Sequence, residues 1–216
     1  MLTIIGDILN WAGLILAPLA LAPLIYLATG ADFARRVAGA IAGAADAVNQ
    51  RLASGVIWLA LAMAATQFAL VILRYVFGVS NIAVQESVIY MHAALFLLTA
   101  GYALKTDDHV RVDLFYREAS PRARAIIDLS GFYLFLGPIC ILAIWMAGPY
   151  VASSWAVQEG SNEASGLPAI FLLKSMIPAF AALLFAQGVA AAARAAFTLR
   201  GDELRETPQR DGAPAA

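Results

Sequence analysis

The chain has 216 residues, of which 62% are hydrophobic and only 13% are charged, and its mean hydropathy is +0.76. About a quarter of the residues in a typical soluble domain are charged, so this composition excludes an ordinary water-soluble core and indicates an integral membrane protein in contact with membrane lipid. The net charge of −1 excludes a nucleic-acid partner, because phosphate binding requires a concentrated basic surface.

Five apolar runs are long enough to cross the hydrocarbon core of a bilayer as helices. A helix satisfies its backbone hydrogen bonds internally, which a segment in lipid requires. The sequence therefore predicts an all-α integral membrane protein with a four-helix transmembrane core, an N-terminal hydrophobic helix and an amphipathic interfacial helix. The predicted spans are residues 2–28, 53–77, 85–104, 125–152 and 169–197.

The first run belongs to a predicted N-terminal segment, residues 1–30. No Lys or Arg precedes it and it is longer than the apolar part of a secretory signal, so we interpret it as retained in the protein. Pro18 and Pro23 would kink such a helix, and Asp7 and Asn10 make its start polar. Both a full crossing and a tilted or interfacial segment fit this pattern.

Residues 31–50 have the pattern of an amphipathic helix lying flat on the membrane. Two alternatives remain open for its function: a lateral brace against a partner protein, and an ordinary interfacial linker. The apolar stripe consists of Phe33, Val37, Ala40, Ile41, Ala44 and Val48, and the opposite face of Asp32, Arg35, Asp46 and Asn49.

Basic residues alternate between the connections, which predicts the orientation because short Lys- and Arg-rich loops stay in the cytoplasm. The connections at 79–84 and 153–168 contain no Lys or Arg, and the others are basic. We therefore predict a periplasmic N-terminus, five crossings, a four-helix domain at 51–200 and a disordered cytoplasmic tail at 201–216. The basic residues are Arg35, Arg36 and Arg51 in the first connection, Lys105, Arg111, Arg117, Arg122 and Arg124 in the third, and Arg194, Arg200, Arg205 and Arg210 towards the C-terminus.

Local signals refine the last two spans. Ser120 followed by Pro121 is typical of a helix start, because the hydroxyl caps the helix and the first helical position needs no N–H. Pro138 and Pro149 are expected to bend the helix that follows. In the last span, small residues at four-residue spacing permit another helix to approach closely, most commonly one from the same chain. These are Ala182, Ala186 and Ala190.

No motif for catalysis, metal binding or phosphate binding is found, so we predict no enzyme activity and no cofactor. The alternative function is the membrane anchor of a redox enzyme, in which two histidines would hold a haem. His92 lies within a span and His109 in the charged connection after it, so they would not bind one haem at the same depth. For His92 we expect a hydrogen bond to a neighbouring helix or a partner.

Charges near the membrane are costly and are usually paired. Arg74 and Glu86 lie at the ends of two spans joined by a short loop, so either an ion pair closes this hairpin or both side chains snorkel to water. Lys174 is expected either to meet Glu159 or Glu163 or to snorkel in the same way. The third connection is dense in charges that nearly cancel, which favours internal salt bridges or protein contact over binding to anionic lipid.

Several short stretches resemble a known family. Leu73-Arg74-Tyr75-Val76-Phe77 is similar to its Arg-Tyr signature, and Gln85-Glu86 to its acidic helix start. Gly101-Tyr102-Ala103-Leu104-Lys105 and His109-Val110-Arg111-Val112-Asp113 resemble its most recognisable stretch, and Ser165-Gly166-Leu167-Pro168 is a weaker match. On these residues the chain resembles the small, DctQ-like membrane subunit of tripartite ATP-independent periplasmic (TRAP) transporters over residues 51–200.

The resemblance implies a non-catalytic subunit in a bacterial inner membrane that binds and braces the large, DctM-like transporting subunit. It also implies a periplasmic solute-binding protein, which contacts the subunit directly or through the complex, and sodium-driven uptake of a small organic solute whose identity the sequence does not indicate. The candidate structural or partner-contact residues are Arg74, Tyr75, Glu86, His109, Arg111, Asp113 and Lys174.

Overall fold

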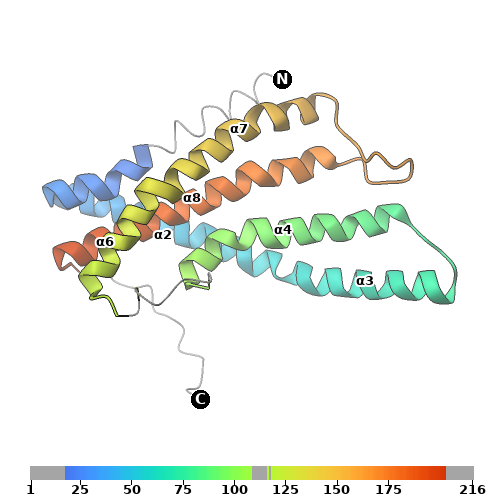
Figure 1. The fold of residues 1–216 in the computed structure, drawn as a ribbon, viewed down its shortest axis with the longest axis horizontal. Helices are drawn as coiled ribbons and strands as arrows, with labels where there is room; N and C mark the ends of the chain where they lie inside the picture. Colours follow the sequence, from blue (N-terminus) through green and yellow to red (C-terminus); the bar gives the residue numbers. More distant parts are fainter. Residues whose placement is uncertain (1–17, 109–115, 117, 203–216) are drawn as a thin grey trace, which may run out of the picture.

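The computed structural model describes residues 18–108, 116 and 118–202, and all regular secondary structure in them is helical (Figure 1). The prediction of an all-α fold is confirmed. After the short helix Pro18–Thr29, the chain forms the following elements: α2 (Asp32–Val56), α3 (Trp58–Val76), α4 (Ile82–Thr106), α6 (Pro121–Gly131), the π-helical turn η1 (Phe132–Leu136), α7 (Gly137–Ala156) and α8 (Ile170–Arg200).

Four helical runs in the described part of the chain are long and apolar enough to cross a membrane. They cover the last four predicted spans except for residues 77 and 169, so the predicted four-helix core is confirmed. Most of the first predicted span, residues 2–28, lies outside the described residues. The runs are Asp32–Val76, Ile82–Thr106, Pro121–Ala156 and Ile170–Arg200.

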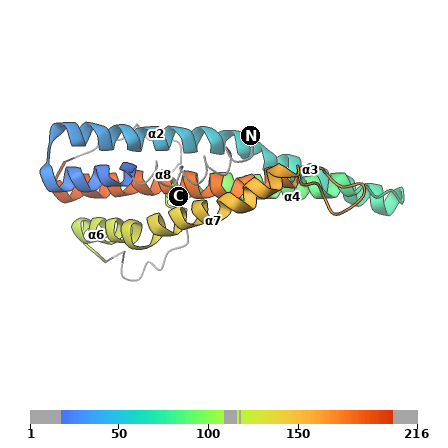
Figure 2. The same ribbon diagram turned by 90° about the horizontal axis from the view of Figure 1, so that it is seen from above.

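Helix α8 is the centre of the bundle. It packs against α2, α4, α6 and α7, whereas α3 packs mainly against α4. Figure 2 shows α8 between α2 on one side and the α6–α7 run on the other, with the α3–α4 hairpin extending past their ends. Because α8 has 31 residues, it is about 46 Å long and exceeds the hydrocarbon core of about 30 Å.

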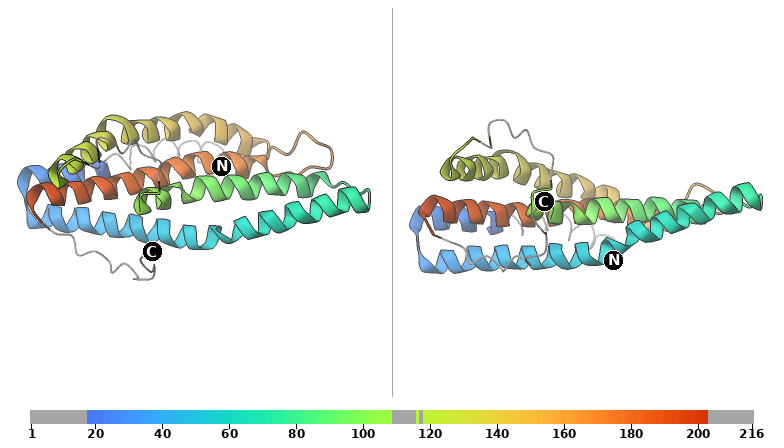
Figure 3. Two further views of the ribbon diagram at one scale, coloured as in Figure 1. Left: turned by 60° about the horizontal axis from the view of Figure 1, so that its bottom comes forward. Right: turned by 90° about the horizontal axis from the view of Figure 1, so that it is seen from below.

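Helices α2 and α3 form one long, bent run of 45 residues along the whole molecule (Figure 3). At 1.5 Å per residue this run is about 68 Å long, about twice the hydrocarbon thickness. Part of it therefore extends beyond the hydrocarbon or crosses it obliquely. The predicted amphipathic helix does not end at residue 50 but continues to Val56.

The packing of α2 differs from the predicted two-faced pattern. Its buried face is a row of alanines with Asn49, while Phe33 is 75% exposed and Val48 is 49% exposed. Asn49, predicted on the polar face, is fully buried. Alanine has no side chain beyond Cβ, so the facing alanines let α2 and α8 approach closely. The interface includes Ala34, Ala38, Ala42, Ala190, Ala193 and Ala196.

The run α6–η1–α7 begins as predicted, because the Ser120 hydroxyl accepts a hydrogen bond from the Ala123 N–H at 3.3 Å and Pro121 is the first helical residue. The π-helical turn directly precedes Gly137 and Pro138, and the Gly137 N–H bonds to the carbonyl of Phe132. Proline offers no N–H and crowds the preceding turn, which accounts for a widened turn at this point.

Candidate functional site

The first polar centre joins the α3–α4 hairpin to the loop between α7 and α8. We call it the outer tie, and the opposite end of the bundle the inner end, after the orientation predicted from the sequence. Glu86, in the second turn of α4, accepts a hydrogen bond from the Leu167 N–H at 2.6 Å and another from the Ser161 hydroxyl. A side chain at Gly166 would collide with Ser161 and Glu86, so this position requires glycine. The Ser165–Pro168 stretch that resembles the family therefore supplies a binding loop for the Glu86 carboxylate.

The structure does not bring Arg74 to Glu86. Of the two alternatives expected for these residues, the ion pair is wrong. Glu86 is held by the α7–α8 loop, and no ion pair joins Arg74 to Glu86 in the described part of the chain. Arg74 lies exposed in the last turn of α3, where its positive charge suits the helix C-terminus. Tyr75 beside it is 80% exposed.

Lys174 lies in the same outer region and is paired. Its ammonium is 2.5 Å from the Glu159 carboxylate and 4.1 Å from the centre of the Tyr150 ring, so of the alternatives expected for Lys174 the structure shows the pair with Glu159. The hydrogen bond from Lys174 lowers the pKa of the Glu159 carboxyl below its usual value. Trp155 adds a bond from its indole N–H to the Ser175 hydroxyl at 2.8 Å, so the outer ends of α7 and α8 are fixed together.

A second polar centre, the inner tie, joins α2 to α8 and was missed by the sequence analysis. The Gln187 side chain donates to the Asp46 carboxylate at 2.7 Å, and Arg194 forms an ion pair with the same carboxylate at 3.1 Å. Asn49 donates to the Gln187 side-chain oxygen at 3.0 Å. The available signals were a lone glutamine in an alanine-rich span and two polar residues three apart on α2, which the amphipathic interpretation assigned to solvent.

The inner tie also contacts α4. A side chain at Gly101 would collide with the Asn49 side-chain oxygen, and that oxygen is buried without a hydrogen-bond donor among the described residues. Four residues later, the Lys105 ammonium donates to the Gln50 side chain at 3.2 Å. The Gly101–Lys105 stretch, which resembles the family, thus lets α2 pass close to α4 and binds it.

A third contact fixes the short helix Pro18–Thr29 to the end of α8. The Tyr26 hydroxyl donates to the Asp202 carboxylate, and the Arg200 guanidinium lies 5.6 Å from the Tyr26 ring and donates to the Tyr26 carbonyl at 3.3 Å. Gly30 follows with φ of +66°, and Arg200 occupies the space where a side chain there would lie. The segment before α3 is therefore bound to α8 at two places, through Tyr26 in the short helix and through Asp46 and Asn49 in α2.

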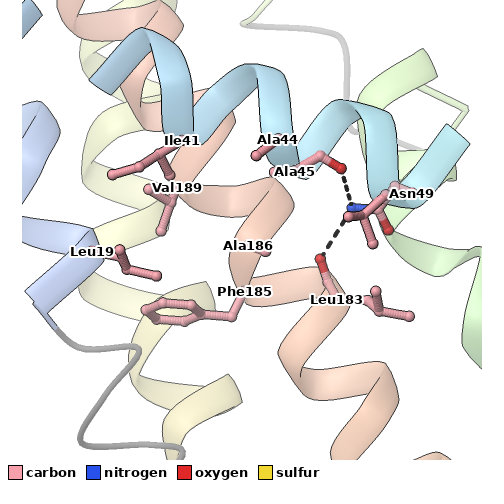
Figure 4. A pocket seen from close by; sticks show the side chains of 10 residues that line it. Leu19, Ile41, Ala44, Ala45, Asn49, Leu183, Phe185, Ala186 and Val189 are labelled. Carbon is pink, nitrogen blue, oxygen red and sulfur yellow. Dashed lines mark hydrogen bonds between the residues drawn. The ribbon is translucent and has the colours of Figure 1, made fainter. Parts of the chain in front are cut away.

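An apolar cavity of about 340 Å³ opens between α2, α8 and the helix Pro18–Thr29 (Figure 4). Its walls are aliphatic and aromatic side chains, and the amide nitrogen of Asn49 at its edge already bonds to the carbonyls of Ala45 and Leu183. The side-chain oxygen of Asn49 is buried and the other described lining residues are apolar, so a polar organic solute would find no hydrogen-bonding side chain exposed in this lining. The cavity therefore lacks the placed polar groups that a site for such a solute uses.

Among the other predicted residues, His109, Arg111 and Asp113 lie outside the described residues. The segment after them is anchored, since the Tyr116 hydroxyl donates to Asp128 at 2.7 Å. The predicted alanine ridge on α8 meets helices of the same chain: Ala190 is fully buried against α2 and the helix Pro18–Thr29. Within the described ranges, no group of three His, Cys, Asp or Glu side chains is placed to hold a metal ion.

These observations define a class: a helical, multi-pass membrane protein in which several polar side chains of the described spans connect its own helices. A family model described as tripartite ATP-independent periplasmic transporters, DctQ component, matches residues 63–198, more than half of the chain. The chain belongs to this family and is a small membrane subunit of a TRAP transporter in a bacterial inner membrane. No curated protein and no solved structure matches it.

Proposed function

We propose that this subunit binds the large, DctM-like transporting subunit and braces it while a small organic solute, delivered by a periplasmic receptor, is taken up with sodium. Membership of the DctQ family carries the proposal. The polar ties support a bracing role, because they connect helices of this chain near the start of α8 and in its second half and give the bundle a fixed shape. A subunit with this arrangement has no transport activity by itself.

The orientation that we propose has the basic end in the cytoplasm. Lys105 at the end of α4 bonds to Gln50 in the last third of α2, and Arg200 at the end of α8 bonds to Tyr26 just before α2 begins. The outer tie lies at the opposite end of α4 and just before α8 begins. A reporter fused after Ala216 is expected to be active if it is of a type that works only in the cytoplasm. Activity confined to the periplasm would contradict the orientation.

The exposed residues of the family's signature stretch are proposed as partner contacts. Arg74 and Tyr75 project from the end of α3 without partners among the described residues, which leaves their polar groups free for another protein. Arg111 and Asp113 are proposed to contact the large subunit from the cytoplasmic connection. Replacing these two together is expected to lower complex assembly or uptake, and normal uptake at normal expression would refute this role.

The test of the proposed function is joint purification and transport. The tagged subunit, expressed together with the large subunit of the same transporter, is expected to recover that subunit in mild detergent. Vesicles that contain both subunits are expected to take up solute when the receptor and a sodium gradient are supplied, and vesicles with either subunit alone are not. Recovery of no large polytopic protein, or uptake by the large subunit alone at the full rate, would refute the proposal.

A further inference from the structure

One polar side chain in the middle of a span lies on the outside of the bundle. His92 is exposed on α4, about 15 Å along the helix from Ile82 and about 21 Å from Thr106. It stacks on Phe96 with 6.2 Å between ring centres, and no described residue forms a hydrogen bond with it. The sequence left two partners open for His92, a helix of this chain or another protein, and the described part of the chain provides none.

His92 belongs to a seam of exposed residues along α4. Gln85, Ile89, His92 and Phe96 follow one another at spacings of four, three and four residues, and Ile89 and Phe96 are 57% and 70% exposed. Such a spacing aligns side chains along one stripe that a single second helix can cover. Ala94, which is buried, lies on the opposite side of α4, because two residues correspond to a rotation of about 200°.

Lipid is a poor cover for this seam. An acyl chain offers no hydrogen-bonding atom, and a polar group held in hydrocarbon without a partner is costly. At the midpoint of α4 the imidazole is also too far from either helix end to snorkel with its short side chain. A protein helix with a hydrogen-bonding group at the same depth satisfies His92, whereas acyl chains leave it unsatisfied.

We propose that the seam Gln85–Ile89–His92–Phe96 is the docking face for a transmembrane helix of the large subunit, which places a hydrogen-bonding group opposite His92. This inference rests on the proposed function and adds the surface through which it operates. The face is held in a fixed position, because Glu86 ties the start of α4 to the α7–α8 loop and Gly101 packs its far end against α2.

Photo-cross-linking tests the position of the docking face. A photoreactive phenylalanine replaces Phe96 in one variant and Trp145 in the control; Trp145 is 63% exposed on α7, about 17 Å from the outer helix end. Both variants are expressed with the large subunit and irradiated in membranes. We expect an adduct with the large subunit from position 96 and little from position 145.

Substitution of His92 tests the hydrogen bond. His92→Leu is expected to weaken recovery of the large subunit by about three- to thirty-fold, the range that interhelical hydrogen bonds in membranes give. His92→Gln, which can still form such a bond, is expected to retain most of the recovery, and Trp145→Leu is the control at similar depth. A comparable loss in His92→Gln and His92→Leu would contradict the hydrogen bond.

The outcomes separate the two proposals. If the wild-type chain recovers the large subunit but position 96 forms adducts only with a second copy of this chain or with lipid, the docking face is wrong and the proposed function stands. Equal adduct yields at positions 96 and 145 also overturn the docking face. If the wild-type chain recovers no large subunit, the proposed function itself fails.

Discussion

Replacing Gln187 by methionine is the sharpest test of the inner tie. Methionine has nearly the same volume and removes both hydrogen bonds of a fully buried side chain: the one to Asp46 at 2.7 Å and the one from Asn49 at 3.0 Å. A bond to a charged group contributes about 1.5–3 kcal/mol and a neutral one about 1 kcal/mol in soluble proteins. Interhelical bonds in membranes average about 0.6 kcal/mol each.

These values place the expected loss in the free energy of unfolding at about 1–4 kcal/mol. The loss falls towards the lower end, because Asp46 keeps its ion pair with Arg194 and Asn49 keeps the carbonyl of Ala45 at 3.1 Å. The assay is equilibrium unfolding of the purified subunit in mixed detergent micelles, followed by circular dichroism.

Gln85→Met is the matched control, since Gln85 is exposed and bonds only to the Ser80 hydroxyl at 2.9 Å among the described residues. Its change is expected within about 0.5 kcal/mol of zero. A double variant that adds Asp46→Ala to Gln187→Met is expected to lose less than the sum of the two single changes, because they share one bond. Equal stability of Gln187→Met and Gln85→Met would refute the inner tie as a stabilising contact.

Three further predictions concern the other contacts. Gly101→Ala is expected to destabilise the fold by about 1–3 kcal/mol, because the new Cβ would collide with Asn49. The control Gly43→Ala, with open space around it, is expected to be neutral or stabilising. Thermal unfolding in detergent compares the two variants, and equal effects would contradict the close approach of α2 and α4. Glu86→Ala is expected to lower the free energy of unfolding by about 1–3 kcal/mol, because the Leu167 N–H loses its acceptor. Arg74→Ala is expected to lower it by about 0.5 kcal/mol or less. A large decrease in Arg74→Ala would indicate that Arg74 and Glu86 do form an ion pair. The pKa of the Glu159 carboxyl is lowered in the folded protein, so the ion pair with Lys174 stabilises the fold above the pKa of Glu159 in the unfolded chain, and this effect is lost as pH falls through the pKa in the folded protein. The difference in unfolding temperature between wild type and Glu159→Gln is therefore expected to shrink on acidification below about pH 4. A difference that grows there would contradict the ion pair.

Charged residues at the outer end show how far sequence reasoning reaches. The pattern placed Arg74, Glu86 and Lys174 near the ends of spans, and the structure places all three there. It did not identify the partner of Glu86, because that partner is a hydroxyl and a backbone N–H from a loop 75 and 81 residues away in the sequence. Neither group has a signature in the sequence, and a backbone N–H is present at almost every residue.

The sequence did not predict the inner tie, for a different reason. Asp46 and Asn49 fall on the polar side of an amphipathic pattern, and such a side normally faces water. Here the opposite helix presents Gln187 and Arg194 at the matching height, so Asp46 and Asn49 contact a polar partner instead of water. Whether a polar stripe faces solvent or a polar partner depends on the neighbouring helix, which the local period does not specify.

The sequence by itself determined the solvent and the class of fold. Long apolar runs with few charges require lipid, and lipid requires helices, because each helix satisfies its own backbone hydrogen bonds. Only the tertiary structure decided that α8 is the central helix, that Glu86 turns to the α7–α8 loop and that His92 remains outside. Those features depend on which faces of separate helices meet, and that is set by packing between residues far apart in the chain.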